Sequence, residues 1–386
     1  MQQDPTNTTI AFCVFKFFPY GGLQRDFLRI ATSCRSRGHP IRVYTLSWEG
    51  DEPDGFEIIR VVPGGLSNHA RYRRFASWVS HHLERYPVRC VVGFNKMPGL
   101  DVYFAADSCF AEKARLTRSS VYRATSRYRF FSQFERAVFD PVNDTEIILI
   151  AAAQRDQFKR YYSTPGHRFH LLPPGVNADR RRPANAAEVR AKFRSESGIG
   201  NDELLILLIG SGFITKGLDR ALRAIQSLPA EIRCRTRLFV IGEDAPGRFQ
   251  RLARKVGIAD QVRFFKGRDD IPAVLQGGDL LLHPAYMESG GIVLLEALVA
   301  GLPVVTTDVC GFAPHVVQAD AGLVIPSPYS QSCLDSALCK ALESEQLRTR
   351  WAENGLAYAE RADIYSQHER AADVIETVMT RRLSER

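Results

Sequence analysis

The chain has 386 residues, 45% of them hydrophobic, which is more than one ordinary domain needs and enough for two cores. Its formal charge is +8, and the whole excess lies in residues 1–180, which hold 25 basic and 17 acidic residues, against 26 and 26 in residues 181–386. This asymmetry points to an acidic partner of the first half, or to a merely solubilising charge. The eight cysteines are scattered without a C-x-x-C pair, and no uncharged apolar run reaches about 18 residues, which argues against a disulfide scaffold and a membrane span.

Apolar runs in the first half predict a series of strands at 9–15, 41–48, 88–94, 101–107 and 145–152. An amphipathic helix follows the first run, with Leu23, Phe27 and Ile30 on one face. Strands that alternate with helices need crossover connections, so the sequence predicts a parallel, doubly wound α/β sheet.

The pattern restarts after a linker at 171–183 that is rich in proline and arginine, with further strands predicted at 203–210, 237–242, 262–267, 279–284 and 302–307. We therefore expect two Rossmann-like domains, at 1–172 and 173–363, facing a central cleft, and a C-terminal helix at 364–386 that packs back on the first domain. Ligands of such sheets bind beyond the carboxyl ends of the strands, so the loops after the strands are the candidate sites.

Two of these loops carry glycines next to polar residues. In "FPYGGLQRDF", Gly22 opens a helix and allows close approach of a ligand, while Asp26 faces the cleft or the solvent. In "GSGFITKGLDRAL", Lys216 stands just before a helix N-terminus, which is a poor place for a cation unless an anionic ligand binds there. This pattern favours a phosphate role for Lys216 over that of an ordinary surface lysine.

A third loop reads "HPAYMESGGIVLLEALVAG" at 283–301 and contains two glutamates, Glu288 and Glu296, eight residues apart. We expect Glu288 in the loop, a helix that begins near Gly290, and Glu296 about two turns into it. Since an unpaired buried carboxylate is costly, Glu296 needs a partner, either a sugar hydroxyl or a nearby protein group.

The pattern E-x7-E after a strand, together with "GFITKG" and "FPYGGLQRDF", resembles the retaining nucleotide-sugar glycosyltransferases that have two Rossmann-like domains (the GT-B type). The segments "VGFNKMPGLDVYFAAD", "LLPPG" and "AGLPVVTTDVCG" resemble more closely the lipopolysaccharide core glucosyltransferases of Gram-negative bacteria. That resemblance implies transfer of glucose from UDP-glucose, as an α-1,3 linkage, to a heptose of the lipopolysaccharide inner core carried on lipid A.

The resemblance also assigns roles to individual residues. It implies that Glu288 binds the donor sugar, Glu296 the ribose and Lys216 the diphosphate, and that Gly22, Gly291 and Ile292 contact the donor. Many relatives have an arginine where Gly210 stands, so Arg180 in the linker is the candidate for the second cation. Asp107 occupies the place of a histidine of many relatives and is either catalytic or the N-cap of the following helix, and Lys96 is a candidate acceptor or cleft residue.

The same resemblance implies a reaction that needs no cofactor and no metal, because Lys216, Arg180 and the helix N-termini stabilise the charge that develops on the leaving UDP. The chain contains no Asp-x-Asp metal motif. The oligomeric state is not predicted.

Residues 110–139 hold seven basic and two acidic residues interleaved with aromatics. Such a segment predicts peripheral attachment to an anionic membrane, here the cytoplasmic face of the inner membrane, through Arg123, Arg127, Arg129, Phe130 and Phe131. A packed basic helix is the alternative, and contact with nucleic acid is not expected because no RNA-binding motif accompanies the segment.

Other functions stay open at this point. The same fold could serve a transferase with another donor sugar or acceptor, or a nucleotide-sugar epimerase. A non-enzymatic peripheral membrane or RNA-binding protein is the third alternative, which the four polar residues of the cleft loops argue against.

Overall fold

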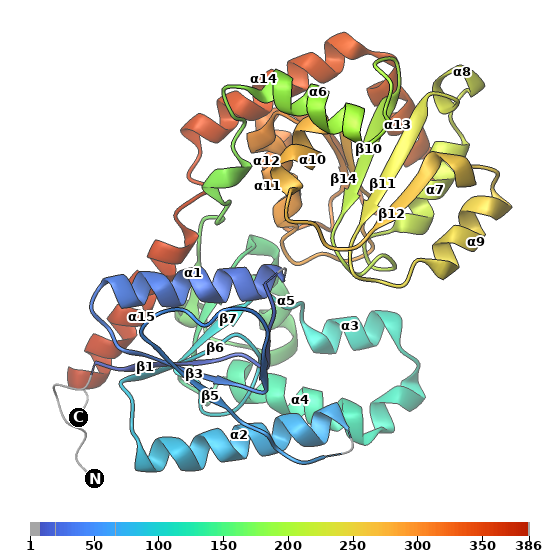
Figure 1. Cartoon of the computed structure of the whole chain (residues 1–386). Coiled ribbons are helices and arrows are strands. Elements are labelled where there is room, and N and C mark those ends of the chain that lie inside the picture. The colour runs from blue at the N-terminus through green and yellow to red at the C-terminus, as the bar shows by residue number, and fades with distance from the viewer. Residues whose placement is uncertain (1–7, 20, 66, 385–386) are drawn as a thin grey trace. The chain divides into compact units, whose positions relative to one another are not determined.

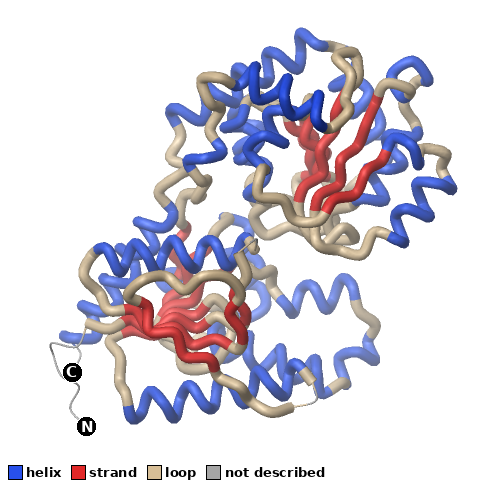
Figure 2. The backbone as a smooth tube through the Cα atoms, in the orientation of Figure 1, coloured by secondary structure: helices blue, strands red, loops and turns tan. Residues whose placement is uncertain are grey.

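The computed structural model describes residues 8–19, 21–65 and 67–384 (Figure 1). The contacts of the chain group into two compact units, Met1–Pro173 with Ser366–Arg386, and Pro174–Tyr365. Each unit is an α/β sandwich with a parallel sheet between layers of helices (Figure 2). Within the described residues, no helix is long and apolar enough to cross a membrane.

The first unit is built on a seven-stranded sheet in which all paired strands are parallel. In spatial order, its strands are β5 (Phe56–Arg60), β3 (Ile41–Thr45), β1 (Ile10–Cys13), β6 (Cys90–Gly93), β7 (Val102–Ala105), β8 (Glu146–Leu149) and β9 (Phe169–Leu171). The short strands β2 (Lys16–Phe17) and β4 (Ser47–Trp48) form a separate pair.

Helices cover both faces of this sheet because residues along each strand alternate between two cores. Ile10 and Phe12 of β1 belong to one core, and Ala11 and Cys13 belong to the other. The first core includes side chains of α1 (Gly22–Ser36) and α15 (Gln367–Ser384). The second includes side chains of α2 (Asn68–Arg85), α4 (Ser126–Phe139) and α5 (Ala152–Tyr162), and the remaining helices of the unit are α3 (Phe110–Thr117), η1 (Ser120–Ala124) and η2 (Gly166–Arg168).

The last helix of the chain, α15, belongs to the first unit although it follows the second in sequence. Its side chains Ala371, Ala372 and Ile375 are fully buried in the core that α1 shares. Arg37 at the end of α1 pairs with Asp373 at 2.8 Å and with a second carboxylate of α15. Apolar packing and ion pairs therefore hold α15 against the first unit.

The second unit is built on a six-stranded parallel sheet. In spatial order, its strands are β12 (Val262–Phe265), β11 (Thr236–Ile241), β10 (Leu204–Ile209), β13 (Leu280–His283), β14 (Val304–Thr307) and β15 (Gly322–Ile325). Its helices are η3 (Ala178–Arg180), α6 (Ala186–Glu196), α7 (Leu218–Gln226), α8 (Ala230–Arg233), α9 (Gly247–Lys255), η4 (Ala259–Gln261), α10 (Ile271–Gly277), α11 (Ile292–Ala300), α12 (Ala313–Ala319), α13 (Gln331–Glu343) and α14 (Glu345–Arg361).

The order of the strands confirms the predicted fold class. When the strands are numbered in chain order within each large sheet, the second sheet runs 3-2-1-4-5-6 and the first runs 3-2-1-4-5-6-7, which is the order of Rossmann-like, doubly wound sheets. The order reverses between β10 and β13 in the second unit and between β1 and β6 in the first. Ligands of such sheets bind at this reversal, beyond the carboxyl ends of the strands.

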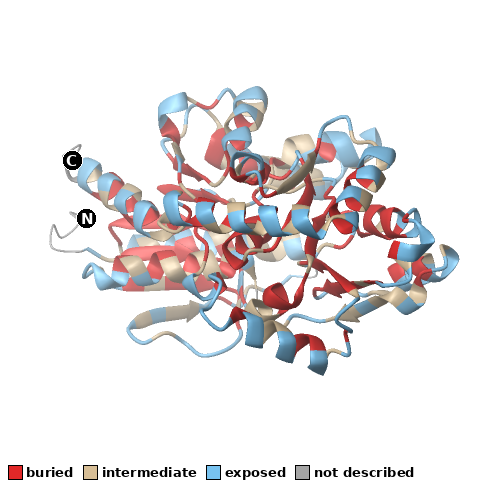
Figure 3. Cartoon of the chain, turned by 90° about the horizontal axis from the view of Figure 1, so that it is seen from above, coloured by how far each residue is buried: buried red, intermediate tan, exposed pale blue. Residues whose placement is uncertain are grey.

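Four of the described strands were not predicted: β2 of the two-stranded sheet, and three strands at the edges of the two large sheets. The three edge strands are β5, β9 and β15, whose residues are mostly exposed or half-buried, whereas the central strands β1, β6, β10 and β13 are wholly buried. Figure 3 colours the chain by burial, with buried residues in red and exposed residues in pale blue. An edge strand has one neighbour and partial cover, so its sequence lacks the continuous apolar run that marks a central strand. The predicted strand at 41–48 is also divided, into β3 and β4.

Candidate functional site

The loops after β10 and β13 lie against each other at the reversal point of the second sheet. The amide of Tyr286 donates to the carbonyl of Thr215 at 2.7 Å. Gly217, which precedes α7, has a φ of +72°, and a Cβ on it would lie 2.0 Å from the carbonyl oxygen of Pro284. Only glycine fits both the left-handed backbone and this close approach.

Lys216 and Glu288 meet across these two loops. The Nζ of Lys216 donates to Oε2 of Glu288 at 2.6 Å, and the two side chains are 15% and 20% exposed. The stem of Lys216 lies over Gly210, where an added Cβ would approach its Cε to 2.6 Å. Gly210, which stands where many relatives have an arginine, therefore leaves the space that the Lys216 side chain occupies.

Sequence reasoning missed His283, the last residue of β13. Its side chain is fully buried, its Nε2 lies 3.5 Å from Oε2 of Glu288, and its Nδ1 has no hydrogen-bond partner among the described residues. Burial lowers the pKa of His283, so the imidazole is neutral at pH 7. Its place at the carboxyl end of a strand beside the reversal point was a signal that could have identified it.

The surroundings of Glu288 keep it ionised. Burial raises the pKa of its carboxyl, but His283 and the Lys216 ammonium outweigh burial and lower that pKa to about 2. The carboxylate is thus an acceptor only, suited to the hydroxyl or ammonium groups that meet it. As expected, Glu288 lies in the loop after β13, where its backbone forms an isolated β-bridge with that of Cys310. Helix α11 begins four residues later, at Ile292.

Helices α7 and α11 both begin next to this pair without a side-chain cap. Their N-caps are Gly217 and Gly291, and neither helix has a capping side-chain hydrogen bond. The first amides of an uncapped helix, together with the helix dipole, favour an anion. Ile292 is the first residue of α11 and is half-buried.

Glu296 lies one turn into α11, not two as predicted, because the helix begins at Ile292 with Gly291 as its N-cap, and its side chain is buried, 4% exposed. Its Oε1 accepts from Nε of Arg180 at 3.2 Å, and Arg180, 7% exposed, also donates to Asp179 at 2.9 Å. Of the two partners that the sequence left open for Glu296, the structure contains a protein group. Arg180 and Glu296 form a second, more deeply buried ion pair of the same unit.

Arg220 anchors the loop that carries Glu288, and sequence reasoning did not identify it. Its guanidinium carbon lies 3.5 Å from the ring centroids of Tyr286 and Tyr329. Its Nη1 donates to the carbonyls of Pro284 and Ala285 at 3.2 and 2.8 Å. Two cation–π contacts and two hydrogen bonds therefore fix the backbone just before Glu288.

The first unit positions the other predicted residues. Gly22 is the first residue of α1, is exposed and has open space where a Cβ would stand, and Asp26 is half-buried one turn further on. Tyr20 of the motif "FPYGGLQRDF" lies outside the described residues. Lys96 follows β6 at the reversal point of the first sheet, but its Nζ donates to Ser108 O at 2.9 Å and to Glu135 at 2.6 Å. The ammonium of Lys96, predicted to be an acceptor or cleft residue, thus hydrogen-bonds within the first unit.

Glu135 is a buried carboxylate that sequence reasoning did not identify. Besides Lys96, it accepts from the amides of Phe110 and Ala111 at 2.7 and 3.0 Å and from the hydroxyl of Tyr162 at 2.5 Å. It therefore occupies the N-terminus of α3 from another helix. Because these partners lie 24 to 39 residues from Glu135 in the chain, no local sequence pattern predicted the contacts.

This arrangement shows that the structural alternative for Asp107 was wrong. Asp107 follows β7 and is exposed, and the N-cap of α3 is Cys109, without a capping side-chain hydrogen bond. Glu135 takes the capping role that was considered for Asp107. The carboxylate of Asp107 thus remains a candidate for a role in chemistry.

The structure corrects the aromatic part of the predicted membrane contact. Phe130 is 1% exposed and packs on Phe134, with ring centroids 4.1 Å apart, and Phe131 is half-buried beneath the guanidinium of Arg127. A ring buried in the core cannot enter a membrane without local unfolding. Arg123, Arg127 and Arg129 are exposed, as expected for a charged surface.

Within the described part of the chain, no group of three or more His, Cys, Asp or Glu side chains is arranged to hold a metal ion. Two basic side chains and two helix N-termini gather instead at the end of the second sheet. Together with two carboxylates, they form a site that can hold a diphosphate and hydroxyl groups. A nucleotide sugar presents both kinds of group, a diphosphate and hydroxyls.

Comparisons with known proteins agree with this geometry. The profile of the family "Glycosyl transferases group 1" matches residues 189–357. The lipopolysaccharide glucosyltransferase WaaG of Escherichia coli strain K12 is 49% identical over 366 residues, which span 95% of this chain and 98% of that protein. The crystal structure of WaaG superposes with a TM-score of 0.91 at 48% identity, covering 95% of this chain and 99% of that one.

More distant proteins are similar in sequence or in fold. The D-inositol 3-phosphate glycosyltransferase of Streptomyces scabiei is 26% identical over 364 residues, 89% of this chain and 71% of that protein. The structure of Anabaena HepE in complex with UDP-glucose has a TM-score of 0.75 at 17% identity, covering 96% of this chain and 99% of that one.

The fold and the site define a glycosyltransferase of the GT-B type, a class that uses nucleotide-sugar donors. The predicted resemblance is confirmed, and the enzyme class with it. The chain belongs to the group 1 glycosyltransferase family that includes the lipopolysaccharide glucosyltransferase WaaG.

Proposed function

We propose that the protein transfers glucose from UDP-glucose to a heptose of the lipopolysaccharide inner core, with retention of the α anomer. The observation that carries the proposal is the meeting of Lys216 and Glu288 beside two uncapped helices at the reversal point of a Rossmann-like sheet. The 49% identity to a lipopolysaccharide glucosyltransferase supports the choice of sugar and acceptor. Nothing comparable favours an epimerase or a non-enzymatic role.

In this proposal, the donor diphosphate lies at the N-termini of α7 and α11. Lys216 moves its hydrogen bond from Glu288 to the phosphate, and Glu288 is then available to accept hydrogen bonds from the glucose hydroxyls. His283, neutral and 3.5 Å from Glu288, orients that carboxylate. Preorganised cations and amides stabilise the charge that grows on the leaving UDP, so the reaction proceeds without a divalent metal.

The buried pair of Arg180 and Glu296 serves the nucleotide. Glu296 accepts from the ribose hydroxyls, in the manner of the acidic residues of dinucleotide-binding sheets. Arg180, 3.2 Å from Glu296, keeps that carboxylate ionised and contributes positive charge to the diphosphate. Of the residues of the first unit, we assign Gly22 to the donor, Asp26 to the acceptor and Asp107 to catalysis.

We further propose that the protein works as a peripheral protein on the cytoplasmic face of the inner membrane, where its lipid-linked acceptor lies. Residues 110–139 carry a net charge of +5, from seven basic and two acidic residues. Because Phe130 is buried, the apolar contact comes from Leu116 and Val121, which are 60% and 75% exposed. Cations at headgroups and two inserted side chains give reversible attachment.

A panel of labelled donors tests the choice of sugar. The purified protein is incubated with heptose-terminated lipopolysaccharide and UDP-glucose, UDP-galactose or GDP-mannose. We expect label in the lipopolysaccharide from UDP-glucose at a rate at least about tenfold above the others, a difference that requires only about 1.4 kcal/mol in the transition state. Faster incorporation from another donor would replace glucose in the proposal.

A further inference from the structure

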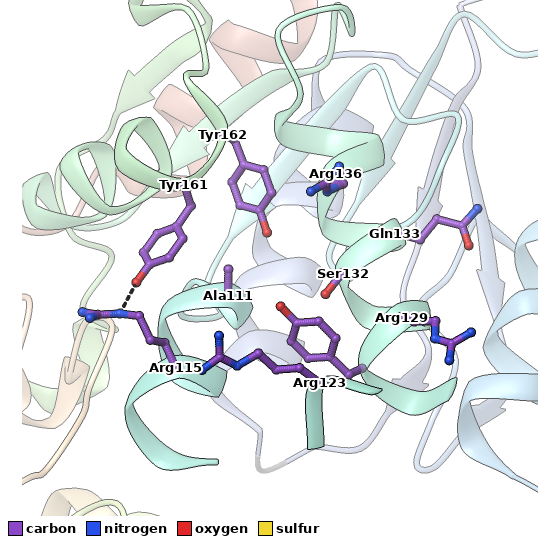
Figure 4. Close-up of a pocket in the computed structure, with 10 residues that line it drawn as sticks. Ala111, Arg115, Arg123, Arg129, Ser132, Gln133, Arg136, Tyr161 and Tyr162 are labelled. Carbon is purple, nitrogen blue, oxygen red and sulfur yellow. Dashed lines mark hydrogen bonds between the residues drawn. The ribbon is translucent and has the colours of Figure 1, made fainter. Parts of the chain in front are cut away.

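The first unit contains a pocket of about 470 Å³ that no part of the proposed reaction uses. It lies among α3, η1, α4 and α5 (Figure 4). Four arginines and three tyrosines line it with smaller polar residues: Ala111, Arg115, Arg123, Tyr128, Arg129, Ser132, Gln133, Arg136, Tyr161 and Tyr162. None of these ten residues is acidic, so the lining carries a formal charge of +4.

The charges of the pocket are only partly satisfied by the protein. Arg115 donates to the hydroxyl of Tyr161 at 2.8 Å, and Arg129 donates to the carbonyl of Ala124 at 3.0 Å. The guanidinium groups of Arg123 and Arg136 have no hydrogen bond or ion pair with any other described residue. Like charges gathered around one space repel each other, and a bound anion would reverse that repulsion.

A second, independent observation comes from Ser132. Its hydroxyl is buried and has no hydrogen-bond partner among the described residues, although it lines the pocket. Figure 4 shows the hydroxyl oxygens of Ser132 and Tyr162 directed toward the space between the helices. Tyr162 donates its proton to Glu135, so its oxygen can accept. Buried polar groups normally have a partner, so an unsatisfied hydroxyl here points to a ligand.

The size and the lining of the pocket indicate the class of that ligand. Arginine guanidinium groups recognise phosphate oxygens through paired hydrogen bonds. A volume of about 470 Å³ exceeds that of one small ion and falls in the range of organic ligands. The tyrosines, Ser132 and Gln133 offer donors and acceptors to neighbouring hydroxyls. We infer that this pocket binds a phosphate ester of a polyol.

Two sources would supply such a group: a phosphorylated sugar of a glycan acceptor, or the headgroup of a phospholipid such as phosphatidylglycerol. The inference itself does not depend on the proposed transfer reaction, since the pocket lies within the first unit and its lining includes none of the donor residues. Both sources present the same phosphate chemistry, and the experiment separates them.

Isothermal titration calorimetry with glucose 6-phosphate tests the pocket on the full chain, without a donor. We expect the wild type to bind glucose 6-phosphate saturably and not to bind glucose. Arg123→Gln/Arg136→Gln should weaken binding at least about tenfold, and Ser132→Ala about fivefold, as expected for charge-assisted and neutral hydrogen bonds. The matched control is Arg118→Gln. Arg118 lies in the same basic segment and stacks on Tyr122, but it does not line the pocket. The affinity of this variant for glucose 6-phosphate should stay within about twofold of the wild type, because a single distant charge is screened.

Flotation with phosphatidylcholine vesicles, with and without phosphatidylglycerol, identifies the source. If glucose 6-phosphate binds and Ser132→Ala weakens that binding, while vesicle binding does not change in Ser132→Ala, the phosphorylated sugar is the ligand; if Ser132→Ala weakens both, the pocket accepts both phosphate esters. If only phosphatidylglycerol vesicles bind and Ser132→Ala weakens that binding, the headgroup is the ligand. The inference is overturned if neither probe binds, or if Ser132→Ala and Arg123→Gln/Arg136→Gln bind as well as the wild type or no worse than Arg118→Gln. Failure of the donor panel would refute the proposed reaction and leave this result intact.

Discussion

The surroundings of Glu288 in the second unit favour its ionised form strongly. Its pKa of about 2 lies below the ordinary 4.5, since His283 and Lys216 outweigh the effect of burial. A depressed carboxyl pKa contributes stability that is fully present above the unfolded pKa and is lost as the pH falls through the folded one. A shift of this size corresponds to about 3 kcal/mol.

We therefore expect Glu288→Gln to lower the free energy of unfolding of the second unit at pH 7, and the difference from the wild type to shrink between about pH 4.5 and pH 2. Hydrogen exchange of peptides from β13 and α11, measured in urea at several pH values, follows this unit separately. Burial lowers the pKa of His283 and so reduces stability in acid in both proteins, and Glu288 opposes this shift in the wild type. The difference is therefore compared only between about pH 4.5 and pH 2. A difference that is constant with pH would contradict the ion pair.

Glu296 provides a second test at this scale. If it binds the ribose, Glu296→Gln should weaken UDP affinity by about tenfold or more, the value of a hydrogen bond to a charged group. Calorimetry with UDP measures this affinity, and Asp179→Asn, which alters the exposed partner of Arg180, is the matched control. An unchanged UDP affinity in a folded Glu296→Gln variant would leave Glu296 only its structural pairing with Arg180.

At the scale of elements, the close approach of the two loops in the second unit holds the site together. A Cβ at Gly217 would collide with the backbone of Pro284, so Gly217→Ala should destabilise the unit by about 2 kcal/mol or more and displace Lys216. Gly257→Ala is the control, because Gly257 has a similar φ of +75° but open space around it. Thermal unfolding and UDP affinity are measured for both. Equal effects of the two substitutions would show that backbone strain, and not loop contact, explains the loss.

How far the sequence predicted the structure depended on how local each signal was. The central strands and the helix start after Glu288 were predictable because long apolar runs and a glycine pair mark them. The burial of Phe130 was also predictable. Apolar residues recur every four positions along α4, at Phe130, Phe134 and Val138, and therefore share one face of the helix. The interpretation of the segment as a membrane surface gave charge more weight than this period.

Other features of the site could not be predicted, because their partners lie far apart in the chain. Arg180 and Glu296 are 116 residues apart, and Lys216 and Glu288 are 72 apart. Residue type and loop position identified Lys216 and Glu288, spacing identified Glu296, and the family resemblance identified Arg180. None of these signals indicated which cation meets which carboxylate. Glu135 left no signal at all, because a single acidic residue in a basic helix normally indicates a solvated face.

At the scale of the whole molecule, the asymmetric charge predicts salt-dependent attachment to membranes. The protein should float with vesicles that contain phosphatidylglycerol at low salt and be released at high salt. Leu116→Ser/Val121→Ser should reduce vesicle binding about tenfold, because two exposed apolar side chains lose their contact with the interface. Val62→Ser, on an exposed residue outside the segment, is the control. If the control and the double variant bind alike, the segment 110–139 is not the membrane contact.

The most direct test of the account is one transfer assay with UDP-glucose and heptose-terminated lipopolysaccharide, read by mass spectrometry of the product. We predict that the lipopolysaccharide gains one hexose, that excess EDTA leaves most of the rate, and that Glu288→Ala abolishes the gain while the variant stays folded. A lipopolysaccharide that remains unmodified, or a rate that collapses with EDTA and returns with magnesium, would contradict the proposed metal-independent glucosyl transfer.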